Sequence, residues 1–112
     1  MIKYRLKKSS CINVKGMLEK WLKYYLDDGG FFREIDSADK KIYVFCADDF
    51  SLRINSTLSM MLVVEESANG CFADVVVSGG ASGLLRIGHG AEKSRAKMLI
   101  EMLTENGFVF TD

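Results

Sequence analysis

The residues best suited to bind a ligand or take part in a reaction lie in one glycine-rich stretch, residues 79–94, which holds the only histidine. Free backbone amides at the start of a helix bind phosphate or carboxylate groups, and a following lysine and serine add side-chain contacts. Our second-ranked hypothesis is therefore a pocket for a small apolar or anionic ligand, bordered by residues 79–83 and 88–90. Its candidate ligand-binding residues are Gly79, Gly80, Ser82, Gly88, His89, Gly90, Lys93 and Ser94.

The spacing of this stretch matches no established phosphate-binding motif. Lys93 stands where G-x-G-x-x-G requires its last glycine, and the pattern G-x-x-x-x-G-K-[ST] is absent. Glycines at 88 and 90 often serve only the geometry of a short turn. Residues 79–83 fit a hairpin turn with a bulge equally well.

An enzymatic hypothesis uses His89 as a general acid or base, or Cys11 as a nucleophile. We rank it last because no triad, carboxylate pair or metal-ligand spacing accompanies either residue. No catalytic residue is assigned, and we expect neither a cofactor nor a metal ion. Cys11, Cys46 and Cys71 are an odd number without C-x-x-C spacing, which predicts free thiols in a reducing compartment.

Length and composition predict a single domain over residues 1–112, with 48% apolar residues to form its core. The 15 basic and 15 acidic residues cancel, so the surface has no general attraction to nucleic acid or to an anionic membrane. The most apolar window, residues 58–64, is too short to span a bilayer. No apolar run follows the basic start, so we expect no secretory signal and a cytoplasmic location.

The elements that must position these residues follow from hydrophobic periodicity. Alternation predicts strands over residues 2–7, 31–36, 41–47, 50–55, 58–66, 71–78 and 109–110, and a further strand reaching Ile87 between the two glycine groups. Three- and four-residue spacing predicts helices over residues 14–28 and 91–106. The fold class is α+β, with two layers: a mainly antiparallel sheet of five to six strands and two helices on one face, in β-α-β(4–5)-α order.

The helix ends carry local signals. Asn13 is a candidate N-cap. Gly29 or Gly30 ends the first helix, with Phe31 as the closing apolar contact. Gly107 and Phe108 predict a Schellman ending for the second helix.

Asn69-Gly70 lies between two β-rich runs and is the strongest hairpin signal in the chain. A two-residue turn at this pair sets Val64 opposite Val75, on a face that we expect the helices to cover.

The same register sets Glu65 opposite Asp74, and like charges in that position are unfavourable. A cation, a metal ion or a register shift would relieve the repulsion. We favour a salt link to Arg53 or Arg86 over a metal ion.

The second face of the predicted sheet is more apolar than a face in contact with water should be. This excess predicts a homodimer contact, although a ligand pocket or a sheet curved over its own surface would also account for it. We favour a non-enzymatic domain that self-associates through this face, whose candidate interface residues are Met61, Val63, Phe72 and Val76.

The segment Val77-Ser78-Gly79-Gly80, followed by Ile87 and by Gly90-Ala91-Glu92, resembles a group of small, functionally uncharacterised bacterial domains. The resemblance implies a bacterial cytoplasmic origin and carries over no catalytic residue. The element order is also similar to helix-grip folds, in which an antiparallel sheet curls around a long C-terminal helix and can enclose an apolar ligand. The short helix predicted here implies at most a reduced, half-barrel form of that fold.

Overall fold

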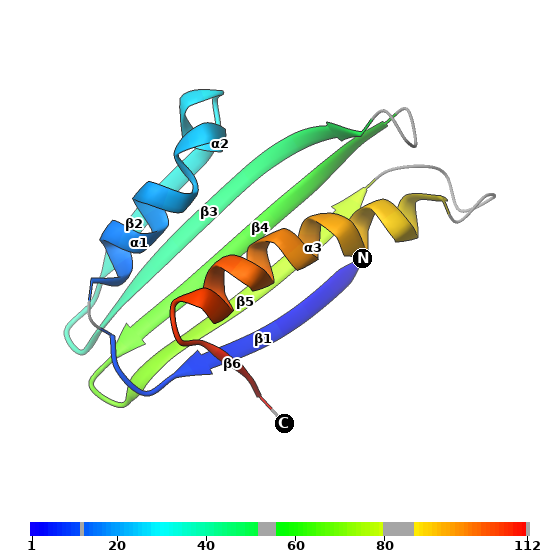
Figure 1. Cartoon of the computed structure of the whole chain (residues 1–112). Helices are drawn as coiled ribbons and strands as arrows, with labels where there is room; N and C mark the ends of the chain where they lie inside the picture. The colour runs from blue at the N-terminus through cyan, green and yellow to red at the C-terminus, as the bar shows by residue number, and fades with distance from the viewer. Residues whose placement is uncertain (12, 52–55, 80–86, 112) are drawn as a thin grey trace.

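The computed structural model describes residues 1–11, 13–51, 56–79 and 87–111. These residues form an open antiparallel sheet of six strands with three helices, which confirms the predicted two-layer α+β fold (Figure 1). In chain order the elements are β1 (Ile2–Lys8), α1 (Val14–Trp21), α2 (Lys23–Asp27), β2 (Phe31–Asp36), β3 (Lys40–Ser51), β4 (Ser56–Ser67), β5 (Gly70–Gly79), α3 (Ile87–Glu105) and β6 (Val109–Phe110). The strands lie in the order β2-β3-β4-β5-β1-β6.

All three helices lie on one side of the sheet, as Figure 1 shows. The pair α1 and α2 lies beside β2 and β3, whereas α3 packs mainly against β5. Within the described part of the chain, no helix is both long and apolar enough to cross a membrane.

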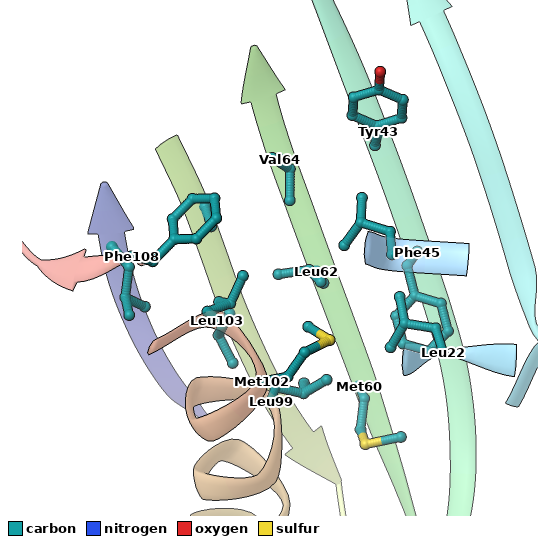
Figure 2. Packing of buried hydrophobic residues seen from close by; sticks show 14 of the residues in the cluster. Leu22, Tyr43, Phe45, Met60, Leu62, Val64, Leu99, Met102, Leu103 and Phe108 are labelled. Atoms are coloured by element: carbon teal, nitrogen blue, oxygen red, sulfur yellow. The ribbon is translucent and has the colours of Figure 1, made fainter. Parts of the chain in front are cut away.

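The core lies between the helices and this face of the sheet. Strand alternation directs every second side chain of β4 and β5 toward the helices, so that Leu62 and Val75 are almost fully buried. Figure 2 shows Leu62 between Leu103 of α3 and Phe45 of β3. Leu62 therefore joins the two helical units and the sheet in one apolar cluster.

The first predicted helix is broken rather than continuous over residues 14–28. Leu22, with φ −100° and ψ 5°, separates α1 from α2 while remaining buried. The change of direction keeps the chain against the sheet, because the Tyr25 ring lies 6.0 Å from that of Phe45, edge to face. A straight helix would not follow the twisted sheet in this way.

The predicted helix ends are correct in position but not in every contact. Asn13 occupies the N-cap position, yet its backbone is left-handed (φ 55°) and its side chain makes no capping hydrogen bond. Gly29 has φ +92°, as its role in ending the helix requires, but Phe31 is exposed and does not close the end. Gly107 and Phe108 form the predicted ending: Gly107 has φ +94°, and the Phe108 N–H donates to the Leu103 carbonyl at 3.0 Å.

The β4–β5 turn consists of Ala68 and Asn69, and Gly70 already pairs with Ser67. A Cβ on Gly70 would lie 2.7 Å from the Lys8 carbonyl oxygen, and Gly70 has φ +123°. This glycine is therefore required for the close approach of β1 rather than for the turn itself.

The predicted hairpin register was consequently wrong by two residues. Val64 lies opposite Ala73 instead of Val75, and Val75 lies opposite Leu62. A shift of two residues leaves each side chain on its original face, so the expected apolar face still meets the helices.

The predicted strand over residues 41–47 and the first two residues of the one over 50–55 belong to one element. β3 continues through Asp48 and Asp49 to Ser51, which pairs with Ser56 at the start of β4. Residues 52–55 lie outside the described residues. The polar pair looked like a break in the sequence, but β4 supplies ladder partners for both aspartates.

Cys11 and Cys71 are joined by a disulfide, which corrects the prediction of free thiols. Their Cα atoms are 5.8 Å apart and their sequence separation is 60. That Cα distance lies within the ordinary range for a disulfide. Cys71 of β5 pairs with Lys8 of β1, so the segment that follows β1 carries Cys11 close to Cys71. No local sequence spacing reveals this proximity.

Tyr43 makes the stability of the fold depend on pH in the alkaline range. Tyr43 is 3% exposed, and its hydroxyl donates to Glu66 Oε2 at 3.1 Å. Burial, followed by the hydrogen bond to Glu66, raises the pKa of Tyr43 from 10.0 to about 12. Because the folded-state pKa is the higher one, this stabilisation is complete below about pH 10 and is lost as the pH rises through about 12.

We expect the wild-type protein to lose roughly 3 kcal/mol of unfolding free energy across this pH window through Tyr43 alone. Urea unfolding at a series of alkaline pH values measures the loss, and Tyr43→Phe should remove this part of it. Tyr24→Phe is the matched control, since Tyr24 is exposed. Equal alkaline slopes for wild type and Tyr43→Phe would contradict the assignment.

Candidate functional site on the open face of the sheet

The predicted glycine-bordered pocket is only partly covered by the described residues. Gly79 ends β5 with φ +98°, and Gly80 and Ser82 lie outside the described residues. The other candidates belong to α3, which begins at Ile87 rather than at residue 91. Gly88, His89 and Gly90 form its first turn, and Lys93 and Ser94 are exposed further along.

The expected strand reaching Ile87 is therefore wrong at its end, because Ile87 is helical. The two glycine groups do not flank a strand that ends at this residue. The ligand pocket and the acid–base role of His89 stay predictions.

The face of the sheet opposite the helices, here called the open face, is the strongest candidate site. Strand pairing arranges its side chains in rows, three of which cross the sheet from β2 to β1. The Phe31 row consists of Phe31, Cys46, Met61, Val76 and Lys3. The Arg33 row consists of Arg33, Val44, Val63, Asp74 and Arg5. The Ile35 row consists of Ile35, Ile42, Glu65, Phe72 and Lys7.

Apolar side chains dominate the β2–β5 part of these rows. Phe31 is 47% exposed, Ile35 44% and Met61 38%. No described helix covers this side of the sheet (Figure 1). A contiguous apolar patch left in water indicates a site of association.

The four predicted interface residues all lie on the open face. Met61 and Val76 are paired neighbours in the Phe31 row, Val63 lies in the Arg33 row, and Phe72 lies in the Ile35 row. The Phe72 ring is partly covered by the Arg5 guanidinium, whose Cζ lies 4.7 Å from the ring centroid. These four residues therefore share one face of the sheet, and their role in an interface stays a prediction.

The sequence interpretation missed the contribution of β2 and β3 to this surface. The residues that extend it are Phe31, Ile35, Val44 and Cys46. The sequence did indicate this contribution, because the strand predicted over residues 41–47 carries apolar side chains on both of its faces. What was lacking was the order of the strands, which places β3 beside β4.

The conflict expected between Glu65 and Asp74 does not occur in the actual register. Glu65 Oε1 lies 3.2 Å from Lys40 Nζ, and Asp74 Oδ1 lies 3.8 Å from Arg5 Nε. The predicted partners Arg53 and Arg86 lie outside the described residues. Both observed pairs are partly exposed, so each stabilises the fold by at most about 1 kcal/mol.

A hollow of about 370 Å³ opens near the edge of this face and is lined by residues of four neighbouring strands, β2 to β5. Phe31, Met61 and Val76 form part of its apolar lining. Its polar side includes Ser59, whose hydroxyl donates to Asp48 Oδ1 at 2.9 Å. The hollow is continuous with the Phe31 row, and we treat it as part of the same surface.

The described residues hold no cluster of three or more histidine, cysteine, aspartate or glutamate side chains able to bind a metal ion. Cys46 on the open face is a free, half-buried thiol, and Cys11 is bonded to Cys71. The disulfide removes the predicted nucleophile Cys11 from consideration.

Comparison with family models, with curated proteins and with solved structures finds no match to this chain. The resemblance to small bacterial domains stays a prediction, and the functional inference depends on the open face.

Proposed function

We propose that this protein is a non-enzymatic interaction domain that self-associates by packing its open face against a second copy. The observation that supports the proposal most directly is the uncovered apolar area across four neighbouring strands, β2 to β5. Faces of two antiparallel sheets pack about 10 Å apart with interdigitated side chains. A second copy offers the same shape and chemistry, so one surface serves both partners.

The charge distribution supports association with a like surface. The lysines of β1, Lys3 and Lys7, stand at the margin of the apolar area, and its Phe31 row carries no charged side chain from β2 to β5. Interface cores are depleted of charged residues in the same way. A nucleic-acid surface would require a net positive charge, whereas the 15 basic and 15 acidic residues of this chain cancel.

The resemblance noted in the sequence supports a bacterial, cytoplasmic setting as part of this proposal. The disulfide weighs against that setting, since disulfides persist mainly in oxidising compartments. The fraction of Cys11 open to alkylation in intact cells decides between the two: quantitative alkylation fits the cytoplasm, and full protection excludes it.

We expect the wild-type protein to be a dimer at micromolar concentration, and Met61→Asp to weaken its self-association by about 100-fold or more. Met61 lies at the centre of the Phe31 row, where a carboxylate would be removed from water without a partner. Sedimentation equilibrium and light scattering over a concentration series measure the dissociation constant.

Trp21→Asp is the control, because Trp21 is also exposed but lies on α1, away from the open face. It should leave the dimer intact. A monomeric wild type, or equal weakening by both substitutions, would rule out self-association through the open face.

A further inference from the structure

The three rows of the open face restrict how two copies can stack. Facing sheets related by a twofold axis parallel to their strands keep each row over the same row of the second copy. The position of the axis among the strands then decides which strands of the two copies lie over each other. The side chains on the open face differ enough from strand to strand to distinguish the possible positions of the axis.

We propose that the twofold axis of the dimer runs parallel to the strands, between β3 and β4. This inference rests on the proposed self-association. It places β3 over β4 of the second copy and β2 over β5 of the second copy.

In this arrangement the charges of the Arg33 row meet their opposites. Arg33 lies over Asp74 of the second copy, and Val44 lies over Val63. Arg33 forms no ion pair with any described residue of its own chain; its guanidinium rests over the Phe31 ring, with Cζ 5.5 Å from the centroid. Among the described residues, Asp74 makes the long 3.8 Å contact with Arg5 and no other ion pair. Both groups are available for an intermolecular pair.

The flanking rows bring apolar side chains together, except that Glu65, which is paired with Lys40, lies over Ile42 of the second copy. Phe31 lies over Val76 of the second copy, and Ile35 lies over Phe72. The cations Lys3 and Lys7 of β1 fall beyond the partner's edge strand and remain in water. Sheets pack about 30° from alignment because of their twist, and the long Arg33 side chain can span the resulting offset.

Other positions of the axis are electrostatically worse. An axis along β4 sets β2 over β1 of the second copy, which places Arg33 against Arg5 and Phe31 against Lys3. An axis between β4 and β5 sets β3 over β1, which places Val44 against Arg5. Each of these buries a cation against a cation or against an apolar side chain, at a cost in desolvation.

An axis perpendicular to the strands is excluded on similar grounds. It stacks each strand over its own copy, so that Asp74 lies over Asp74, or over the apolar Val76 when the centre moves by half a row. Of the axis positions compared, the one between β3 and β4 sets Arg33 over Asp74 and leaves one charged group of each copy, the Lys40-paired Glu65, over an apolar side chain.

Charge reversal tests the pairing directly. Arg33→Asp alone and Asp74→Arg alone should each weaken homodimerisation by tenfold or more, since each sets like charges together twice. Mixing the two variants should restore a heterodimer with a dissociation constant near that of the wild type, because both of its pairs then join unlike charges. Native mass spectrometry separates the heterodimer from the two homodimers.

Cross-linking provides a second test that needs no charge change. The proposed axis sets the two copies of Cys46 on either side of it, with Cα atoms roughly 11 Å apart. Cys46 is the free cysteine of the chain, so a short bis-maleimide should join the wild-type dimer and should not join Cys46→Ser.

The outcomes separate this inference from the function on which it rests. If Met61→Asp dissociates the dimer but the mixed variants form no heterodimer and Cys46 does not cross-link, the axis is elsewhere and self-association through the open face stands. If Met61→Asp has no effect, the proposed function fails. Recovery of the heterodimer together with cross-linking establishes the axis.

Discussion

Replacing Cys11 with serine is expected to lower the free energy of unfolding by about 4 kcal/mol. The disulfide with Cys71 closes a loop with a sequence separation of 60, and it stabilises the folded state chiefly by restricting the unfolded chain. Losses of this size are a large fraction of the stability of a typical small domain. Urea denaturation of wild type and Cys11→Ser under non-reducing conditions measures the difference.

Two comparisons make this prediction specific to the disulfide. Reducing agent should lower the stability of the wild type to that of Cys11→Ser and leave the variant unchanged. Cys46→Ser should change little, because Cys46 is a free thiol. If the oxidised and reduced wild-type proteins unfold at the same urea concentration, the disulfide does not contribute as expected.

Leu62→Ala is expected to destabilise the protein by about 3 kcal/mol, within the range of 2–5 kcal/mol for such core truncations. Leu62 is only 1% exposed and contacts residues of both layers (Figure 2). Its loss removes buried apolar area and leaves a cavity that α3 and β3 can close only in part. Urea unfolding by circular dichroism gives the difference in free energy.

The neighbouring Met61 supplies the control on the same strand. Its side chain points to the open face, so Met61→Ala in dilute, monomeric protein should cost less than about 1 kcal/mol. At dimeric concentrations the same substitution should cost more, because unfolding is then coupled to dissociation. Equal losses for both substitutions in the monomer would show that Leu62 and Met61 do not lie on different faces.

These two substitutions mark what local sequence could and could not predict. The opposite faces of Leu62 and Met61 follow from alternation, which every residue of a strand obeys whatever its neighbours are. The ending at Gly107 and Phe108 was equally predictable, since a left-handed glycine followed by an apolar residue acts within one turn of helix. The disulfide was not, because Cys11 and Cys71 meet only after β1 pairs with β5.

Part of the candidate site could likewise be predicted from local sequence, and part could not. Met61, Val63, Phe72 and Val76 were identified as a shared surface because their hairpin is local in sequence. Phe31 and Cys46 were missed because they reach this surface through the pairing of β2 with β3 and of β3 with β4. The excess of apolar residues on this face was visible in the sequence, and its extent was not.

The sequence by itself determined the two layers, the face on which each strand residue lies and the apolar character of the second face. These properties depend on periodicity, which short-range backbone geometry imposes. Only the tertiary structure decided the hairpin register, the break at Leu22 and the partners of Glu65 and Asp74. A shift of two residues leaves the faces unchanged, so the hydrophobic pattern alone does not select the register. The close approach of Lys8 to Gly70 accompanies the register that is found.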